Sequence, residues 1–325
     1  MRKVLAAMSA AISIVLGAGA SSADTYPSRT ITIVVPFSAG GPTDTVTRLV
    51  AESMQRTLGQ QIIVENVSGA GGTLGTGRVA RAEPDGYTLL VYHIGMATSA
   101  TLYRKLAYDT KGDFAYIGLV TEVPMTLVAR KDFPAKDLAE LISYVKANKD
   151  KVTYANAGIG AASHLCGMLF MSAIETPLTT VPYKGTGPAM TDLIGGQVDF
   201  MCDQTTNTTS QIKGGKIKAY AVTSAKRLKA LPDLPTAEEG GLKGFQVGIW
   251  HGLYAPKGMP DEAIAKLTGA LQKALADQNV IDRFAELGTE PVSASEATPA
   301  ALQTKLLSEI DRWAPVIKAA GVYAD

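Results

Sequence analysis

Hydrophobic and polar residues follow one another along this chain in short blocks that predict alternating strands and helices. The apolar run Ile31–Val35 predicts a buried strand, and within 45–58 apolar residues recur at every third or fourth position, as on one face of a helix. Strands at 61–65 and 87–93 and a helix at 73–82 are predicted in the same way. This succession predicts a parallel sheet with helices on both of its faces.

The pattern begins again near Pro124 and changes towards the C-terminus. Further strands are predicted at 125–130, 152–156, Thr179–Pro182, 198–202 and 217–223, with helices at 137–148, 163–174 and 188–194. A long extended segment at 245–255 is followed only by helices, at 261–276, 280–287 and 299–319. We therefore predict two α/β domains joined by crossovers near Val123 and Val247, one formed by 24–123 with 248–325 and the other by 124–247.

The N-terminal residues predict export from the cytoplasm. Arg2 and Lys3 are followed by an apolar run over 4–20, and small residues then lead to a cleavage site after Ala23. This is the composition of a secretory signal peptide over 1–23, and it predicts a periplasmic protein. A membrane anchor is the alternative, but alanine, serine and glycine dilute the run below the hydrophobicity that a membrane span needs.

Charge and cysteine content limit the classes of partner. The formal net charge is +1, without a block of like charges, whereas nucleic-acid binding requires a marked basic excess. No nucleic-acid partner is therefore expected. Cys166 and Cys202 are the only cysteines. In an exported protein a disulfide between them is favoured over two separate buried thiols, and both interpretations stay open.

Two glycine-rich segments carry the strongest chemical signal in the sequence. They are PFSAGGPTD at 36–44 and GAGGTLG at 69–75, and each lies between a predicted strand and a predicted helix. A loop of this kind directs the free N–H groups at the start of a helix towards a ligand. Two such loops from neighbouring strands predict one small anion site without lysine or arginine, and a carboxylate is the expected occupant.

Motifs for catalysis, metal binding or nucleotide binding are not found. The three histidines are not spaced as metal ligands, and HExxH, CxxC and GxSxG are absent. The GxGxxA string at 75–80 falls inside a predicted helix, and neither glycine loop ends in GK[ST]. We expect no catalytic residue, metal or cofactor. Asp44 is expected to cap the first helix, Asp203 to serve either structure or ligand specificity, and Trp250 to pack in the core rather than line the cleft.

Ten short segments in a fixed order make the chain resemble one known family. They lie at 26–27, 36–44, Ala70–Gly72, 84–88, 163–165, 181–185, 195–201, 221–227, 231–236 and 252–260, and they include VPYKG, GGQVDFM and GLYAPKGMP. With them the chain resembles the Bug family of periplasmic solute-binding proteins, the receptors of tripartite tricarboxylate transporters. The resemblance covers essentially the whole chain after the signal peptide. It implies a two-lobed type II periplasmic-binding-protein fold, whose lobes close over a ligand about two hinge crossovers.

The resemblance also implies a function and partners. A monomer without catalytic activity would bind a small di- or tricarboxylate between its lobes and deliver it to membrane permease subunits. A receptor that signals to a sensor kinase is an alternative, because it would use the same closed state. An exported hydrolase or lyase is a further alternative, but it would need a nucleophile–base pair or a metal cluster that the sequence does not supply.

Ligand contacts are carried over from the family by position. The resemblance assigns one ligand carboxylate to first-lobe residues, namely Phe37, Ser38, Ala39, Gly40, Thr43, Ala70 and Gly72, to which we add His93. It assigns the far end of the ligand to second-lobe residues, namely Ala161, Ser163, His164, Tyr183, Lys184, Gly185 and Asp203. His164 is alternatively expected to cap its helix or pack against the pocket wall. Family members often have serine or threonine at the position of Ala161, and the lost hydroxyl predicts a longer or more apolar ligand, such as an aliphatic dicarboxylate or terephthalate.

Overall fold

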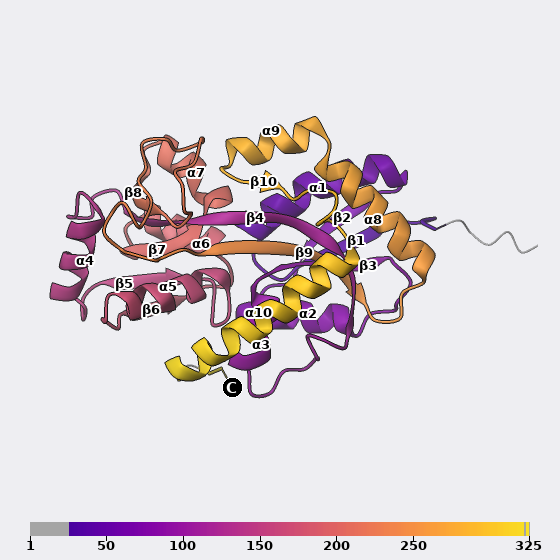
Figure 1. Ribbon diagram of the computed structural model, residues 1–325, viewed down its shortest axis with the longest axis horizontal. Helices are drawn as coiled ribbons and strands as arrows, with labels where there is room; N and C mark the ends of the chain where they lie inside the picture. Colours follow the sequence, from indigo (N-terminus) through magenta and orange to yellow (C-terminus); the bar gives the residue numbers. More distant parts are fainter. Residues whose placement is uncertain (1–25, 322, 325) are drawn as a thin grey trace, which may run out of the picture.

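Residues 26–321 and 323–324 are described by the computed structural model in Figure 1, so the predicted signal peptide lies outside the described residues. The strands are β1 (Ile31–Val35), β2 (Ile62–Asn66), β3 (Thr88–His93), β4 (Phe114–Arg130), β5 (Thr153–Asn156), β6 (Thr179–Pro182), β7 (Phe200–Gln204), β8 (Ile217–Val222), β9 (Gly248–Pro256) and β10 (Glu290–Pro291). The helices are α1 (Pro42–Leu58), α2 (Thr73–Ala80), α3 (Gly95–Leu102), α4 (Leu138–Ala147), α5 (Ala162–Ala173), α6 (Thr186–Ile194), α7 (Thr205–Lys213), α8 (Asp261–Leu275), α9 (Gln278–Glu286) and α10 (Pro299–Ala320), with a short turn of 3-10 helix, η1 (Ala70–Gly72).

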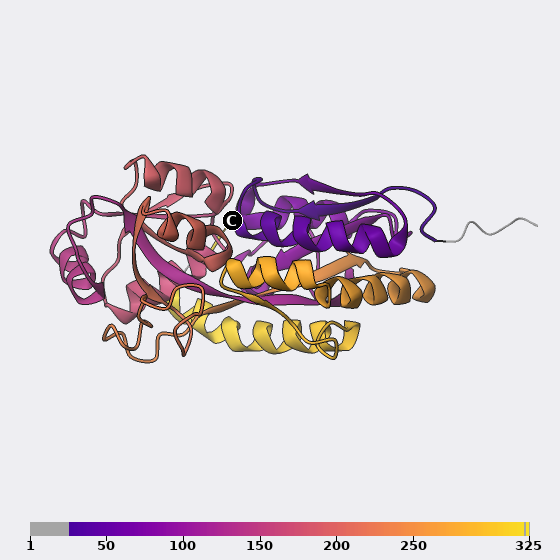
Figure 2. The ribbon, with the colours of Figure 1, turned by 90° about the horizontal axis from the view of Figure 1, so that it is seen from above.

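A single sheet connects the strands in the order β2-β1-β3-β9-β4-β7-β5-β6, with β8 and β10 also paired to β4. Strand β1 is parallel to β2 and β3, and β5 is parallel to β6 and β7, whereas β4 and β9 run antiparallel to their neighbours. The two parallel groups lie at opposite ends of the molecule (Figures 1 and 2). They form a first lobe, with α1–α3 and α8–α10, and a second lobe, with α4–α7. The predicted two-lobed α/β fold is confirmed.

Strand β4 passes from one lobe into the other. Its first part, up to Pro124, pairs with β9, and from Met125 onward it pairs with β7 and β8. Both predicted crossovers lie here, because Val123 pairs with Ile249 of β9 and Val247 immediately precedes β9. The crossover at Val123 is therefore part of the continuous strand β4. The crossover at Val247 leads directly into β9, which pairs with β4. The domain boundaries themselves stay a prediction.

Some elements differ from those expected because tertiary contacts form them. The strand predicted at 125–130 is only the second half of β4, whose first half contains Gly118 and Glu122. Helices α3 and α7 were not predicted, because α3 begins with glycine and α7, TTNTTSQIK, is rich in threonine, a poor helix former. Each is held in helical form by packing against another helix, α3 against α10 and α7 against α1.

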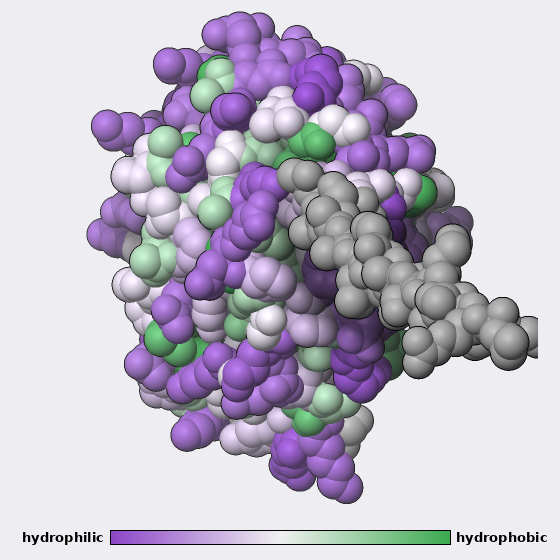
Figure 3. All heavy atoms as spheres, turned by 90° about the vertical axis from the view of Figure 1, so that its right-hand side faces the viewer, coloured by the Kyte–Doolittle hydropathy of each residue, from purple (hydrophilic) through white to green (hydrophobic). Residues whose placement is uncertain are grey.

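The hydrophobic core extends from one lobe into the other along β4 and β9. Trp250 is 2% exposed and packs there, as predicted, together with Tyr254 of the first lobe and Phe200 of the second. A second cluster lies between α1, α8 and the first-lobe strands. On the face in Figure 3 hydrophilic residues predominate and hydrophobic ones are scattered, as is ordinary for a surface in water. Among the described helices, none combines the length and the apolar character that crossing a membrane requires.

Candidate functional site

A narrow cavity with about 10 Å³ of free space lies where the two lobes meet. The first lobe contributes Phe37, Gly41, Pro42, Thr43 and His93, and the second contributes Ala157, Ala162, Ser163, Thr186, Asp203 and Gln204. Five of these were predicted as ligand contacts, namely Phe37, Thr43, His93, Ser163 and Asp203. Of the others, Gly41 and Pro42 lie within the first glycine-rich segment but were not named as contacts, and the second-lobe residues were not named individually. Since both lobes supply the walls, a molecule in the cavity would be held between them.

The N-terminus of α1 opens into this cavity. Gly41, Pro42 and Thr43 line the cavity at the first turn of this 17-residue helix, and no side chain caps Gly41. Pro42 has no N–H of its own, so the free donors of the first turn begin at Thr43. An uncapped helix start favours a negatively charged group, because its N–H groups lack partners and the helix dipole is positive there. The first glycine loop thus has the geometry that the sequence predicts.

Asp44 fixes the loop in front of α1. Its carboxylate accepts hydrogen bonds from the Gly40 N–H (3.0 Å), from Arg48 (3.0 Å) and from Asn66 (3.0 Å). Burial raises the pKa of Asp44, but the hydrogen bonds outweigh burial and hold the pKa below its usual value. Asp44 is structural, as predicted, although it binds the N–H of Gly40 in the loop instead of capping the helix.

Two buried histidines support the first-lobe wall. His93 accepts a hydrogen bond from the Gly95 N–H at Nδ1 (2.9 Å), which places its own proton on Nε2. Burial and the neighbouring His251 lower the pKa of His93 well below its usual value, so the ring is a neutral donor. The ring of Phe37 stacks on it at 4.8 Å. Thr43 Oγ1 lies 3.3 Å from Nε2 of His251, whose pKa burial lowers to about 3.

The second glycine loop closes against the second lobe and does not line the cavity. Gly71 lies so near Ile159 that a Cβ on Gly71 would stand 1.8 Å from the Ile159 carbonyl oxygen. The Tyr103 hydroxyl lies between the same segments, 2.7 Å from the carbonyl oxygen of Ala70 and 2.8 Å from that of Ile159. Because Ala70 and Gly72 are outside the wall, only the first of the two glycine loops frames the cavity as expected.

Three further predicted contacts, Ser38, Lys184 and Gly185, join the lobes at the rim of the cavity. The Ser38 N–H and hydroxyl both donate to the Lys184 carbonyl, each at 3.0 Å. Gly185 lies against Ser38, where a Cβ would be 2.9 Å from the Ser38 nitrogen. Thr98 adds a hydrogen bond to the Gly160 carbonyl (3.0 Å). The lobes are therefore closed on each other around the cavity.

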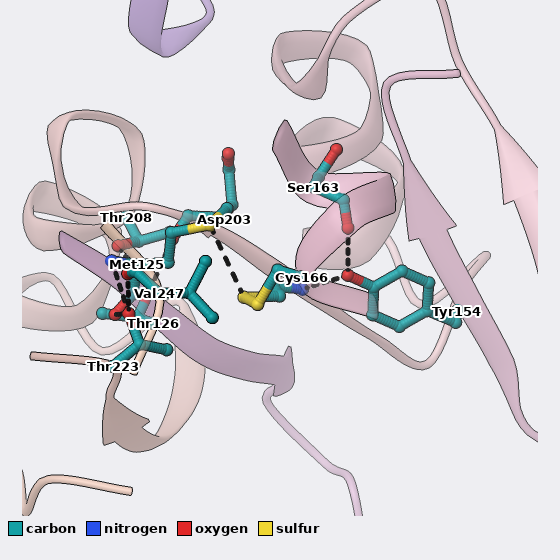
Figure 4. Close-up of a disulfide and its surroundings, with 10 residues drawn as sticks. Met125, Thr126, Tyr154, Ser163, Cys166, Asp203, Thr208, Thr223 and Val247 are labelled. Atoms are coloured by element: carbon teal, nitrogen blue, oxygen red, sulfur yellow. Dashed lines mark hydrogen bonds between the residues drawn. A yellow bond between two sulfur atoms is a disulfide. The ribbon is translucent and has the colours of Figure 1, made fainter. Parts of the chain in front are cut away.

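A disulfide underlies the second-lobe wall (Figure 4). It joins Cys166 of α5 to Cys202 of β7, the pairing favoured from the sequence. Tyr154 strengthens the same junction, because its hydroxyl donates to the Ser163 carbonyl (2.6 Å) and accepts from the Cys202 N–H (3.2 Å). The side chains of Ser163 and Asp203 project to the same side of this junction, and both line the cavity.

Asp203 is the ionisable acid in the cavity wall. It is 1% exposed, and one carboxylate oxygen accepts a hydrogen bond from Asn207 (2.6 Å). Burial raises the pKa of Asp203 to about 6, although hydrogen bonds from Asn207, the Gln204 N–H and Thr186 favour the charged form. The sequence left open whether Asp203 serves structure or specificity, and the structure places it in the wall.

Tyr183 and Ala161 do not reach the cavity. The Tyr183 hydroxyl donates to Asp192 of α6 (2.7 Å), which directs the ring away from the wall. Ala161, the N-cap residue of α5, is fully buried in the hydrophobic core. The residue that faces the cavity is Ala162, one position later, because the chain turns into the helix there.

The remaining predicted contacts lie beside the cavity. His164 accepts a hydrogen bond from the Gly160 N–H at 3.4 Å, and burial lowers its pKa to about 4, so it fixes the loop before α5. Ala39 and Gly40 border a separate surface hollow next to α6. Among the described residues, no three His, Cys, Asp or Glu side chains gather as a metal site would require.

Comparison with known proteins agrees with this geometry. Residues 46–322 match the family model TctC, described as the tripartite tricarboxylate transporter family receptor. The chain belongs to this family. A UPF0065 protein of Agrobacterium vitis, from the TAR-I ttuE-ttuC' intergenic region, is 57% identical to this TctC-family chain over 302 residues, which are 93% of this chain and 87% of that protein.

Solved structures related to TctC share the fold. The periplasmic binding protein BugD is 56% identical, with a TM-score of 0.90 over 92% of this chain and 100% of that one. MatC (Rpa3494) from Rhodopseudomonas palustris, solved with bound malate, is 46% identical, with a TM-score of 0.87 over 90% of this chain and 100% of that one. These similarities confirm the resemblance to the Bug family and the periplasmic-binding-protein fold.

Proposed function

We propose that this chain is a periplasmic receptor that binds a short dicarboxylate between its lobes and delivers it to a tripartite tricarboxylate-type transporter. The uncapped N-terminus of α1, which opens into a cavity formed by both lobes, is the observation that carries the proposal. Such a helix start favours a carboxylate through its N–H groups and its dipole. MatC, with bound malate, supports a ligand of the same chemistry.

The cavity favours a short acid. In this closed form the free space is about 10 Å³, room for about one water molecule, so the lobes must move apart to admit any acid, and they must move least for a short one. Ser163 already accepts the Ala157 N–H (2.9 Å), so its own O–H is free to donate from the second-lobe wall. We place one ligand carboxylate at α1 and the other near Ser163. The longer ligand predicted from Ala161 loses its support, because Ala161 does not face the cavity.

Capture requires the lobes to separate and close. We place the lobe boundaries at 24–123 with 248–325 and at 124–247, with the hinge at Pro124 and Gly248, where the pairing of β4 with β9 ends. Closure would form the rim contacts between Ser38 and Lys184 and between Thr98 and Gly160. This is the hinge closure by which two-lobed binding proteins enclose a ligand. One chain supplies both walls, so a monomer suffices.

Calorimetry tests the proposal. Titration of the mature chain with succinate, L-malate and citrate should give a dissociation constant of about 1 μM or tighter for at least one four-carbon acid. Inorganic phosphate should not bind. Thr43→Val should weaken binding about tenfold, because it removes a hydroxyl from the first-lobe wall at a cost of about 1.4 kcal/mol. Failure of every carboxylate to bind would reject the proposal, and uptake of the bound acid by cells with and without the chain tests delivery.

A further inference from the structure

The C-terminal tail, residues 323–324, lies against the segment that follows α3 (Figure 1). Ala324 pairs in parallel with Tyr103, the C-cap residue of this helix, whose main chain is extended. The Ala324 N–H donates to the Leu102 carbonyl (2.8 Å), and the Arg104 N–H donates to the Ala324 carbonyl (3.3 Å). The tail therefore holds the main chain on both sides of Tyr103.

Tyr103 connects this segment of the first lobe to the second lobe. Its hydroxyl lies 2.7 Å from the carbonyl oxygen of Ala70 in the first lobe and 2.8 Å from that of Ile159 in the second. Burial raises the pKa of Tyr103, so the hydroxyl keeps its proton and donates at neutral pH. Its one proton is shared by two carbonyls. When the lobes separate, the hydroxyl can stay bonded to Ala70 and release Ile159 to water, so opening leaves no donor unpaired.

The tail is needed to direct this side chain. Tyr103 lies one position beyond the end of α3, so the helix alone does not fix its main chain, and the main-chain conformation limits the rotamers that a side chain can adopt. The Ile159 loop that Tyr103 contacts leads into α5, whose first turn forms part of the second-lobe wall. Neither Tyr103 nor the tail lines the cavity. An effect of either on ligand release would therefore act through closure.

We propose that the C-terminal tail positions Tyr103 as a latch between the closed lobes, and that the two together determine how long a bound acid is retained. The retention of an acid rests on the proposed function, whereas the latch itself does not. Tyr103 is a positioning residue, because it holds the walls together without touching the ligand. Loss of its hydrogen bond should speed release and leave capture by the open lobes unchanged.

Removal of a single hydroxyl tests the latch. Rapid filtration with radiolabelled L-malate should show release from Tyr103→Phe roughly three- to tenfold faster than from the unmodified mature chain, the factor expected for one neutral hydrogen bond. The association rate should not change. Tyr116→Phe is the matched control, because the Tyr116 hydroxyl donates to the Lys111 carbonyl (3.4 Å) within the first lobe. Equal release rates for the two variants would overturn the latch.

A shortened chain tests the part played by the tail. A chain that ends at Gly321 keeps α10 and lacks the paired tail. It should release malate faster by about the same factor as Tyr103→Phe, and so should Ala324→Pro, which removes only the N–H that bonds Leu102. Combining the shortened chain with Tyr103→Phe should add less than about twofold, because both changes remove the same contact. If the two effects multiply, the tail does not act through Tyr103.

A measurement without ligand separates the latch from the proposed function. The amides of Gly158, Gly160 and Ala161 are hydrogen-bonded, so their hydrogen–deuterium exchange reports how firmly the loop before α5 is held. Exchange there should be faster in Tyr103→Phe and in the shortened chain than in Tyr116→Phe. Faster exchange in a chain that binds no carboxylate would keep the latch and reject the receptor function. Malate binding with neither faster exchange nor faster release would reject the latch and keep the receptor function.

Discussion

Asp203 combines two properties that oppose each other, deep burial and a charge that has no counter-ion among the residues the structure describes. Its hydrogen-bond partners are neutral, and the acid form is therefore favoured more in the folded chain than in the unfolded chain. Such a group binds its proton more tightly when the protein is folded. It therefore stabilises the fold most at low pH, and this contribution is lost as the pH rises through the folded-state pKa.

This linkage predicts a pH-dependent difference between the unmodified chain and Asp203→Asn. The pKa of Asp203 rises from 3.8 to about 6 on folding. Between pH 4.5 and pH 7.5 the free energy of unfolding of the unmodified chain should fall by about 2 kcal/mol relative to the variant. Denaturant unfolding of both proteins at the two pH values measures it. Because His93 and every other titrating group are present in both, a difference that does not change with pH would contradict the prediction.

Side-chain direction limits how much of the site can be predicted from the sequence. Asp203 could be found because it lies at the end of a predicted strand facing the cleft. Gln204 is its neighbour, but an amide without a motif gives no signal, and only the structure places it in the cavity wall. Tyr183 was predicted as a ligand contact, yet its hydroxyl donates to Asp192 and the residue does not line the cavity. A sequence position does not state where the side chain points.

At the scale of elements, η1 and the loop before α5 form a close contact between the lobes. Gly71 has a positive φ of 60° and packs directly on the Ile159 carbonyl. The contact is between main chains, so any side chain at this position would hold the lobes apart. The second glycine loop therefore acts in closure, while the first acts in binding.

Gly71→Ala should lower affinity by tenfold or more for whichever acid binds. The new methyl group would lie 1.8 Å from the Ile159 oxygen, so the closed state becomes inaccessible without rearrangement. Gly59→Ala is the control, since Gly59 has a similar φ of 67° and open space around its Cα. Both variants should lose about 1 kcal/mol of stability through backbone strain, and only Gly71→Ala should lose affinity by calorimetry. Equal affinities of the two variants would exclude this role of η1.

Helix α7 shows why some elements could not be predicted. Its threonines give no amphipathic pattern, but in the structure four of them are buried, and Thr205, Thr208 and Thr209 are hydrogen-bonded. Thr205 donates to the Gly288 carbonyl (3.1 Å) and Thr209 to that of Leu287 (3.1 Å), both just after α9. The partners lie about 80 residues away along the chain, where local periodicity carries no information about them. Strands β1, β2 and β3, by contrast, were predictable because their apolar runs are local.

At the scale of the whole molecule, the lobes are in contact on two sides of the β4–β9 connection. One side is the rim of the cavity, where Ser38 meets Lys184. The other is the contact between α7 of the second lobe and the end of α9 in the first. Closure and ligand binding are therefore expected to be coupled, because the arrangement that forms these contacts is also the one that brings the cavity walls together.

Small-angle X-ray scattering should detect this coupling. Adding a saturating acid to the mature chain should reduce the radius of gyration, because the ligand favours the closed state. Gly71→Ala should remain at the larger radius under the same ligand concentration. Identical scattering with and without ligand, at concentrations where calorimetry shows binding, would argue against hinge closure.

The disulfide between Cys166 and Cys202 determines in which compartment the protein completes its folding. It ties the helix that carries Ser163 to the strand that carries Asp203, so the second-lobe wall is covalently fixed only when the two thiols are oxidised. The cytosol keeps such thiols reduced, whereas the periplasm oxidises them. A chain exported as proposed therefore leaves the cytosol without the covalent link between α5 and β7. The second-lobe wall of the cavity is completed in the periplasm, where the ligand is encountered.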